Sequence, residues 1–199
     1  VQLNEVLVKE FYTDNITNEW NGYRLSAIDG STLELPKSDK ILATFGHVKH
    51  ENKLVPMARI STFYDLLNNI IIDSKIESYE TSEHLLALTH FKRLNKNDLI
   101  IFDRGFYDKD LMYELSKSKY HYLIFVPKHK DKKEIISQMD DGKKEITLHE
   151  FTVNKEQTKY HGQTYLAFLK QIYDKKTQKN YDWVFATNIE EIKLDEIIK

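Results

Sequence analysis

The sequence predicts an α/β fold in which helices flank a mixed β-sheet. Strand-like runs come first, and helical and strand-like patterns then alternate between residues 82 and 126. The run from Leu99 to Phe102 is continuously apolar and is followed at once by Asp103. A run of this kind is typical of a strand that is buried on both faces. Together these patterns indicate helices packed on a mixed sheet.

The composition limits the class of protein. The chain has 199 residues, of which 41% are hydrophobic, enough for one domain with a core of ordinary size. It contains no cysteine, which excludes disulfides and thiolate metal sites. No apolar run is long enough to cross a membrane. The net charge of −2 shows no basic excess of the kind usual in nucleic-acid-binding proteins.

Residues 1–22 are expected to form a lead-in segment. Apolar residues recur near helical spacing in its first half, and Asn21-Gly22 indicates a turn. A strand over 23–35, which carries Asp29, then opens the predicted sheet.

Two more strands are expected at 41–48 and 56–66, and the polar stretch 49–53 between them indicates a hairpin loop. Residues 68–80 contain three consecutive isoleucines, which leave a strand and a turn-flanked piece of core both open. A helix is expected at 82–94, because Thr81 or Ser82 can cap it. Its predicted apolar face comprises Leu85, Leu86, Leu88 and Phe91. The elements expected after it are a strand at 99–102, a helix at 109–119 with Leu111, Met112 and Leu115 inward, and a strand at 121–126.

The residue pattern of the sequence changes after Pro127. Residues 128–144 are highly charged, and strand-like runs follow at 146–153, 164–173 and 182–187. We interpret the whole of 128–187 as a β-rich insertion subdomain. The sheet and helices of 23–127 then form the first part of a core, and 188–199 begin a C-terminal helix. Four lysines at the start of the insertion are candidates for DNA-phosphate contacts, with a solvated loop as the alternative. They are Lys128, Lys130, Lys132 and Lys133.

Two aspartates at the ends of apolar runs carry the main chemical signal. Asp29 follows Ile28 and precedes Gly30, and Asp103 follows Phe102 and precedes Arg104-Gly105. Open α/β sheets bind ligands at the carboxyl ends of their strands. A dry, unpaired carboxylate there costs several kcal/mol, so each aspartate is expected to be paired, hydrated or metal-bound.

Carboxylates in such positions suit hard divalent cations. Mg²⁺ or Mn²⁺ takes oxygen ligands, and two ions about 3.5–4 Å apart can support phosphoryl transfer. Asp29 and Asp103 are therefore candidate catalytic and metal-binding residues. The structural alternative is that Asp29 caps a turn and Asp103 pairs with Arg104 or a lysine. His47 and His50 would face opposite sides of a strand, so they are not expected to share a metal.

Several blocks resemble the DDE transposases of the bacterial IS-four group. Residues 20–36, with the pattern W-x-G-Y-R-L-x-A-I-D-G-S-x-L-x-L-P, resemble the first catalytic block of that family. Residues 58–73 resemble the block that follows, and D-L-I-I-F-D-R-G-F at 98–106 resembles the second catalytic block. Residues 122–128 and 183–188 also match the later pattern, so the resemblance spans nearly the whole chain.

The resemblance implies an RNase H-like fold with a β-rich insertion before the third acid. It implies that Asp29 and Asp103 are the first two ligands of Mg²⁺ or Mn²⁺. It further implies cleavage and strand transfer of double-stranded DNA at transposon ends. The full-length protein would be a cytoplasmic, nucleoid-associated bacterial transposase. A homodimer is an assembly that the resemblance allows for it.

The chain departs from that family at the third acid, a glutamate in a Y-x-x-R-x-x-x-E-x-x-x-x-x-x-K helix. No tyrosine here has an arginine three residues later, and Glu190, Glu191 and Glu196 lack the spacing. We therefore expect an inactive fragment of a transposase catalytic domain. Two alternatives stay open: an RNase H-like nuclease that uses the same aspartates, and a degenerate DNA-binding remnant without chemistry.

Overall fold

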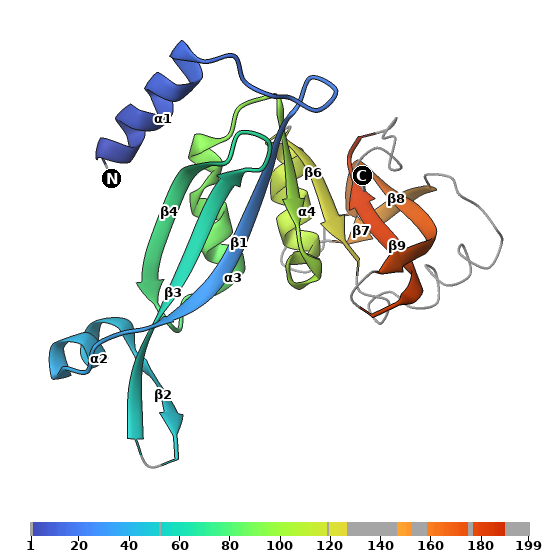
Figure 1. Ribbon diagram of the computed structural model, residues 1–199. Helices are drawn as coiled ribbons and strands as arrows, with labels where there is room; N and C mark the ends of the chain where they lie inside the picture. Colours follow the sequence, from blue (N-terminus) through green and yellow to red (C-terminus); the bar gives the residue numbers. More distant parts are fainter. Residues whose placement is uncertain are drawn as a thin grey trace. The chain divides into compact units, whose positions relative to one another are not determined.

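The computed structural model describes residues 2–51, 53–118, 120–126, 147–152, 159–174 and 177–189 (Figure 1). Its internal contacts divide the chain into two compact units, Val1–Ile100 and Ile101–Lys199. The elements of both units make a mixed α/β architecture, as the sequence predicts. None of the described helices has the length and apolar character that a membrane span requires.

The first unit is built on three long antiparallel strands. These are β1 (Arg24–Glu34), β3 (Lys53–Asp65) and β4 (Ile70–Ser78). With β2 (His47–His50) and β5 (Asp98–Phe102), the strand order is β2-β3-β1-β5, and β4 also pairs with β3. Helix α3 (Glu83–Thr89) contacts β1 and β3, and Figure 1 shows it behind these strands. The other elements of this unit are α1 (Gln2–Asp14), α2 (Asp39–Phe45), β2 (His47–His50), α3 (Glu83–Thr89), η1 (Phe91–Arg93) and β5 (Asp98–Phe102), whose last two residues belong to the second unit.

Most predicted elements of this unit are confirmed. Asn21 and Gly22 adopt positive φ angles of 49° and 80° in the expected turn. Strand β1 and the hairpin that joins β2 to β3 lie where they were predicted, and residues 70–78 resolve the open question in favour of a strand. Strand β5 is almost entirely buried, as its continuous apolar run indicates.

The strand predicted at 41–48 is wrong over its first half, which is helix α2. Ser38 has extended backbone angles and its side-chain oxygen accepts a hydrogen bond from the backbone N–H of Ile41. Asp39 adds a negative charge to the first turn, which favours the positive end of the helix dipole. These two local effects outweigh the β-like composition. Gly46, with φ of 86°, then turns the chain into β2.

The helix predicted at 82–94 begins as expected but ends earlier. Ser82 accepts a hydrogen bond from the Leu85 backbone N–H, and the α-helix stops at Thr89 before a 3-10 turn. The predicted apolar face is partly wrong, because Leu85 is 57% exposed. Leu86 is buried as predicted, and Ala87 is the other buried residue of the helix.

The second unit contains η2 (Arg104–Phe106), α4 (Lys109–Lys117) and β6 (His121–Phe125), followed by β7 (Thr147–Thr152), β8 (Lys159–Asp174) and β9 (Lys179–Thr187). The order among its later strands is β6-β9-β8-β7, with antiparallel pairs throughout. Leu111, Met112 and Leu115 of α4 are buried, as predicted. Strands lie at all three predicted positions after Pro127. The limits of the core, the insertion and the C-terminal segment stay predictions, and residues 190–199 lie outside the described part of the chain.

Candidate active site

Asp29 lies in the middle of β1, at the point where the strand leaves the core. The residues before it alternate between buried and half-buried, whereas those after it are mostly exposed. Its Oδ1 accepts a hydrogen bond of 2.8 Å from the backbone N–H of Gly30. No described residue pairs with the second oxygen. The side chain is exposed, and Asp29 lies within the strand and not at its end as expected.

The residue after Asp29 has to be small. A Cβ atom on Gly30 would lie 2.8 Å from Cγ of Glu83, the first residue of α3. Neighbouring residues of a strand face opposite sides, so Glu83 lies on the face of β1 away from the Asp29 side chain. The Glu83 carboxylate pairs with Arg59 at 2.5 Å. Glu83 is therefore a structural partner of β1 and β3, and not a second ligand beside Asp29.

Asp103 follows the last residue of β5 directly, at the carboxyl end of that strand as predicted. Its Oδ1 accepts a hydrogen bond of 2.7 Å from the backbone N–H of Gly105 and so caps the η2 turn. The side chain is exposed, and no described residue pairs with its second oxygen. A Cβ atom on Gly105 would lie 3.0 Å from Oδ1, so glycine leaves room for this contact.

The structural alternative for Asp103 fails for its nearest candidate. The Arg104 guanidinium lies over the ring of Phe125, 5.2 Å from the ring centre. No ion pair joins it to Asp103 among the described residues. Asp29 likewise has no cation partner in that part of the chain. Both carboxylates are thus exposed and have no cation partner among the described residues.

The donor set of these aspartates fits a hard divalent cation. Each carboxylate has one oxygen held by a backbone N–H and one oxygen open to solvent, and carboxylate oxygens are the ligands that Mg²⁺ and Mn²⁺ prefer. Within the described residues, no group of three or more His, Cys, Asp or Glu is placed to hold a metal. Asp29 belongs to the first unit and Asp103 to the second, so a shared ion stays a prediction. Lys128, Lys130, Lys132 and Lys133 lie outside the described residues, as do Glu190, Glu191 and Glu196.

Comparison with known protein families decides the class of the chain. The family model described as "Transposase DDE domain" matches residues 20–194. The chain belongs to this family. The match contains both Asp29 and Asp103, and the family assignment agrees with the resemblance seen in the sequence.

Two known proteins are similar to this DDE domain. The protein named "Putative transposase InsZ" from Escherichia coli (strain K12) is 25% identical over 114 residues, which are 55% of this chain and 38% of that protein. Among solved structures, the piggyBac transposase in a synaptic complex with hairpin DNA matches with a TM-score of 0.50 and 14% identity. That match covers 85% of this chain and 34% of the piggyBac chain. It supports the RNase H-like fold, and the chain spans little more than a third of either protein.

A buried Ser-His-Asp arrangement in this DDE domain was missed in the sequence. Nδ1 of His90 lies 2.9 Å from Oδ2 of Asp73, and Nε2 lies 3.0 Å from Oγ of Ser61. The order of contacts resembles a hydrolase triad, but His90 is 0% and Ser61 1% exposed. No substrate reaches such a serine, so the arrangement is structural. The three residues come from α3's C-terminus, β4 and β3, far apart in sequence, and no local pattern indicates their contact.

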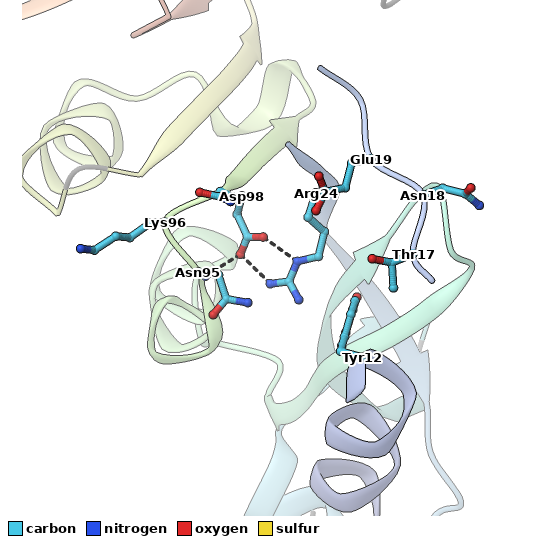
Figure 2. A pocket seen from close by; sticks show the side chains of 9 residues that line it. Tyr12, Thr17, Asn18, Glu19, Arg24, Asn95, Lys96 and Asp98 are labelled. Atoms are coloured by element: carbon cyan, nitrogen blue, oxygen red, sulfur yellow. Dashed lines mark hydrogen bonds and ion pairs between the residues drawn. The ribbon is translucent and has the colours of Figure 1, made fainter. Parts of the chain in front are cut away.

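A cavity of about 400 Å³ lies at the other end of β1 from its exposed half, beside the first residues of β1 and β5. Figure 2 shows the ion pair between Arg24 and Asp98 among its lining residues. Nε and Nη2 of Arg24 donate hydrogen bonds of 2.5 and 2.6 Å to the two carboxylate oxygens of Asp98. The Asn95 backbone N–H also donates to Asp98. These charges satisfy each other, so the cavity offers no free charged group at its centre. We assign no function to it.

Proposed function

We propose that this chain is part of the catalytic domain of a DNA transposase. In this proposal Asp29 and Asp103 would hold divalent ions, Mg²⁺ or Mn²⁺, for the cleavage and joining of DNA strands. The family assignment supports the class of chemistry. The observation that carries the residue assignment is shared by both aspartates. Each is exposed and has no cation partner among the described residues, and each has one oxygen held by a glycine N–H.

The two glycines have a defined part in this proposal. When bound, divalent ions activate water and neutralise charge on the reacting phosphate. The chain's own contribution is to hold the ligand oxygens in position before the ions arrive. The N–H groups of Gly30 and Gly105 restrict rotation of the Asp29 and Asp103 carboxylates, which is the pre-organisation that a ligand set requires. Both aspartates are exposed, so the ions would have access from solvent.

We propose double-stranded DNA, at transposon ends and target sites, as the substrate. The similarity to a transposase solved in complex with hairpin DNA supports this class of partner. Because the chain spans 38% of one similar protein and 34% of the other, activity of the whole protein belongs to the proposal. We further propose that the full-length protein acts as a homodimer at the bacterial nucleoid, in the cytoplasm.

We also propose that these 199 residues lack the third acid. The Y-x-x-R-x-x-x-E-x-x-x-x-x-x-K pattern does not occur in the sequence. On this proposal the chain binds metal weakly and does not transfer strands by itself. A nuclease would require another carboxylate beside Asp29 and Asp103, and the described residues favour none, because Glu83 faces away and pairs with Arg59.

Calorimetry with Mn²⁺ tests the metal site. We would compare the wild type with Asp29→Asn and Asp103→Asn, which keep the side-chain shape but remove the charge. Asp39→Asn is the matched control, because Asp39 is an exposed aspartate on α2. We expect at least a tenfold loss of affinity, about 1.4 kcal/mol, in each site variant and no change in the control.

The outcomes separate the parts of the proposal. Wild-type affinity in both site variants, or no binding by the wild type, would overturn the metal site in this chain. Loss in only one variant would overturn the joint site and leave a single aspartate as ligand.

A further inference from the structure

The hairpin of β2 and β3 forms a surface that the candidate active site does not use. We define the basic ribbon as His47–His50 of β2 together with residues 53–56 of β3. Its register pairs His47 with Pro56, Val48 with Val55, Lys49 with Leu54 and His50 with Lys53. Figure 1 shows this ribbon extending past the ends of β1 and β4. It is a two-stranded projection from the sheet of the first unit.

The ionisable side chains of the ribbon are basic. Its strands carry two lysines and two histidines, all exposed, and no acidic residue. Lys49 and His50 are neighbours on one strand, so they face opposite sides and put a basic group on each face. Neither Lys49 nor Lys53 makes an ion pair with any described residue. Glu51, in the turn, is the one acid at the tip.

The ribbon is continuous with the sheet and is not part of a loop. Strand β3 runs without a break from the ribbon into its pairing with β1, which begins at Met57. At the base, the Met57 N–H donates to the Gly46 carbonyl and the Leu35 N–H donates to the Pro56 carbonyl. The Tyr79 N–H donates to the carbonyl of Phe45, which fixes the end of α2 there. A projection held in this way keeps its lysines in a defined position.

We propose that the basic ribbon binds the phosphate backbone of double-stranded DNA, at a place separate from the candidate active site. The inference rests on the proposed function, which makes DNA the substrate. A two-stranded β-ribbon fits the major groove of B-form DNA, and lysines on both faces reach the phosphates of the groove walls. Thr62, the register partner of Asp29, lies about 30 Å along β3 from Lys53, at about 3.3 Å per residue. The ribbon therefore contacts DNA well away from the bond that Asp29 would serve.

The salt dependence of DNA binding tests the inference. The probe is a short duplex of mixed sequence, and its affinity for the full chain is measured by fluorescence anisotropy from about 50 to about 200 mM salt. The ribbon variant is Lys49→Gln/Lys53→Gln, which keeps the side-chain stems. The control is Lys9→Gln/Lys92→Gln, which removes two exposed lysines of α1 and η1. Each phosphate contact adds about 0.9 to the slope of log affinity against log salt.

We expect the ribbon variant to lose about 1.8 from that slope, the value for two phosphate contacts. The control should keep the wild-type slope, and Mn²⁺ binding should be unchanged in the ribbon variant because Lys49 and Lys53 lie far along the sheet from Asp29. A wild-type slope in the ribbon variant, or an equal loss in the control, would overturn the ribbon alone. Failure of the wild type to bind duplex would overturn the ribbon and the DNA substrate together. Calorimetry of Asp29→Asn and Asp103→Asn still tests the metal site independently.

Discussion

Nδ1 of His90 lies 2.9 Å from Oδ2 of Asp73, and the imidazole is fully buried. An ionised Asp73 only accepts hydrogen bonds, so His90 donates a hydrogen bond from Nδ1. When His90 is neutral, its Nε2 accepts a hydrogen bond from the Ser61 hydroxyl. Lys75 pairs with the same carboxylate at 2.9 Å. This network joins β3, β4 and the end of α3. Ser61 is also the register partner of Gly30, so the network underlies the segment of β1 next to Asp29.

The first prediction concerns stability at mildly acidic pH. Burial lowers the pKa of His90, against the opposing effect of Asp73. The unfolded chain therefore takes up a proton below about pH 6.5 that the folded chain resists, and stability falls as pH drops below that value. The folded pKa of Asp73 is also lowered, because Lys75 and His90 outweigh its burial, so its contribution is lost only at still lower pH.

The measurement is the urea midpoint at a series of pH values for the wild type and His90→Gln. We expect the variant to be less stable at neutral pH and to show a flatter decline between about pH 6.5 and pH 5. Burial lowers the pKa of His121 as well, so part of the slope should survive in the variant. An unchanged slope would show that His90 does not contribute to it.

The second prediction concerns the buried hydroxyl of the same network. Ser61→Ala leaves Nε2 of His90 without its partner in a site that is closed to water. We expect a loss of about 1–3 kcal/mol in the free energy of unfolding, the usual penalty for an unsatisfied buried polar group. Urea denaturation measures it. Ser31→Ala, on the exposed part of β1, should change stability by less than about 0.5 kcal/mol. Similar small effects in both variants would contradict the network.

The third prediction concerns the ion pair between Arg24 and Asp98. The Asp98 side chain is 0% and that of Arg24 10% exposed. Removing one partner leaves the other charge buried and unpaired. Asp98→Asn would do this to the Arg24 guanidinium, so it should lower the free energy of unfolding by about 3–5 kcal/mol. The exposed pair of Arg93 and Glu5 is the comparison, and Glu5→Gln should cost about 0–1 kcal/mol. Chemical denaturation distinguishes the two, and equal losses would show that burial does not govern the strength of the Arg24 pair.

The fourth prediction concerns the close approach of Glu83 to Gly30. Gly30→Ala places a methyl group 2.8 Å from Cγ of Glu83, so the Glu83 side chain has to move and its ion pair with Arg59 weakens. We expect a loss of about 1–3 kcal/mol, as for other overpacked sites. Adding Glu83→Ala removes the clash, so the double variant should lose less than the sum of the single losses. Additive losses in the double-variant cycle would sink this explanation.

The sequence pattern was enough to predict the elements that depend on the side chains of their own segment. The apolar run that ends at Phe102 is buried because it has no polar side chain to expose, and α4 follows from the spacing of Leu111, Met112 and Leu115. Helix α2 was missed because the Ser38 cap and the Asp39 charge in the first turn outweighed a β-like composition. Leu85 was misplaced because spacing alone does not say which side of a helix meets the sheet.

For the candidate site, the sequence by itself determined the residue types and their neighbours. Asp29-Gly30 and Asp103-Arg104-Gly105 place a glycine N–H within reach of each carboxylate, and contacts over one or two residues need no distant part of the chain. Only the tertiary structure decided what surrounds them. Glu83 meets Gly30 because α3 crosses β1, and His90 reaches Ser61 because β3 and β4 pair beneath α3. Such contacts depend on how strands and helices pack, since burial and register join residues that no local pattern relates.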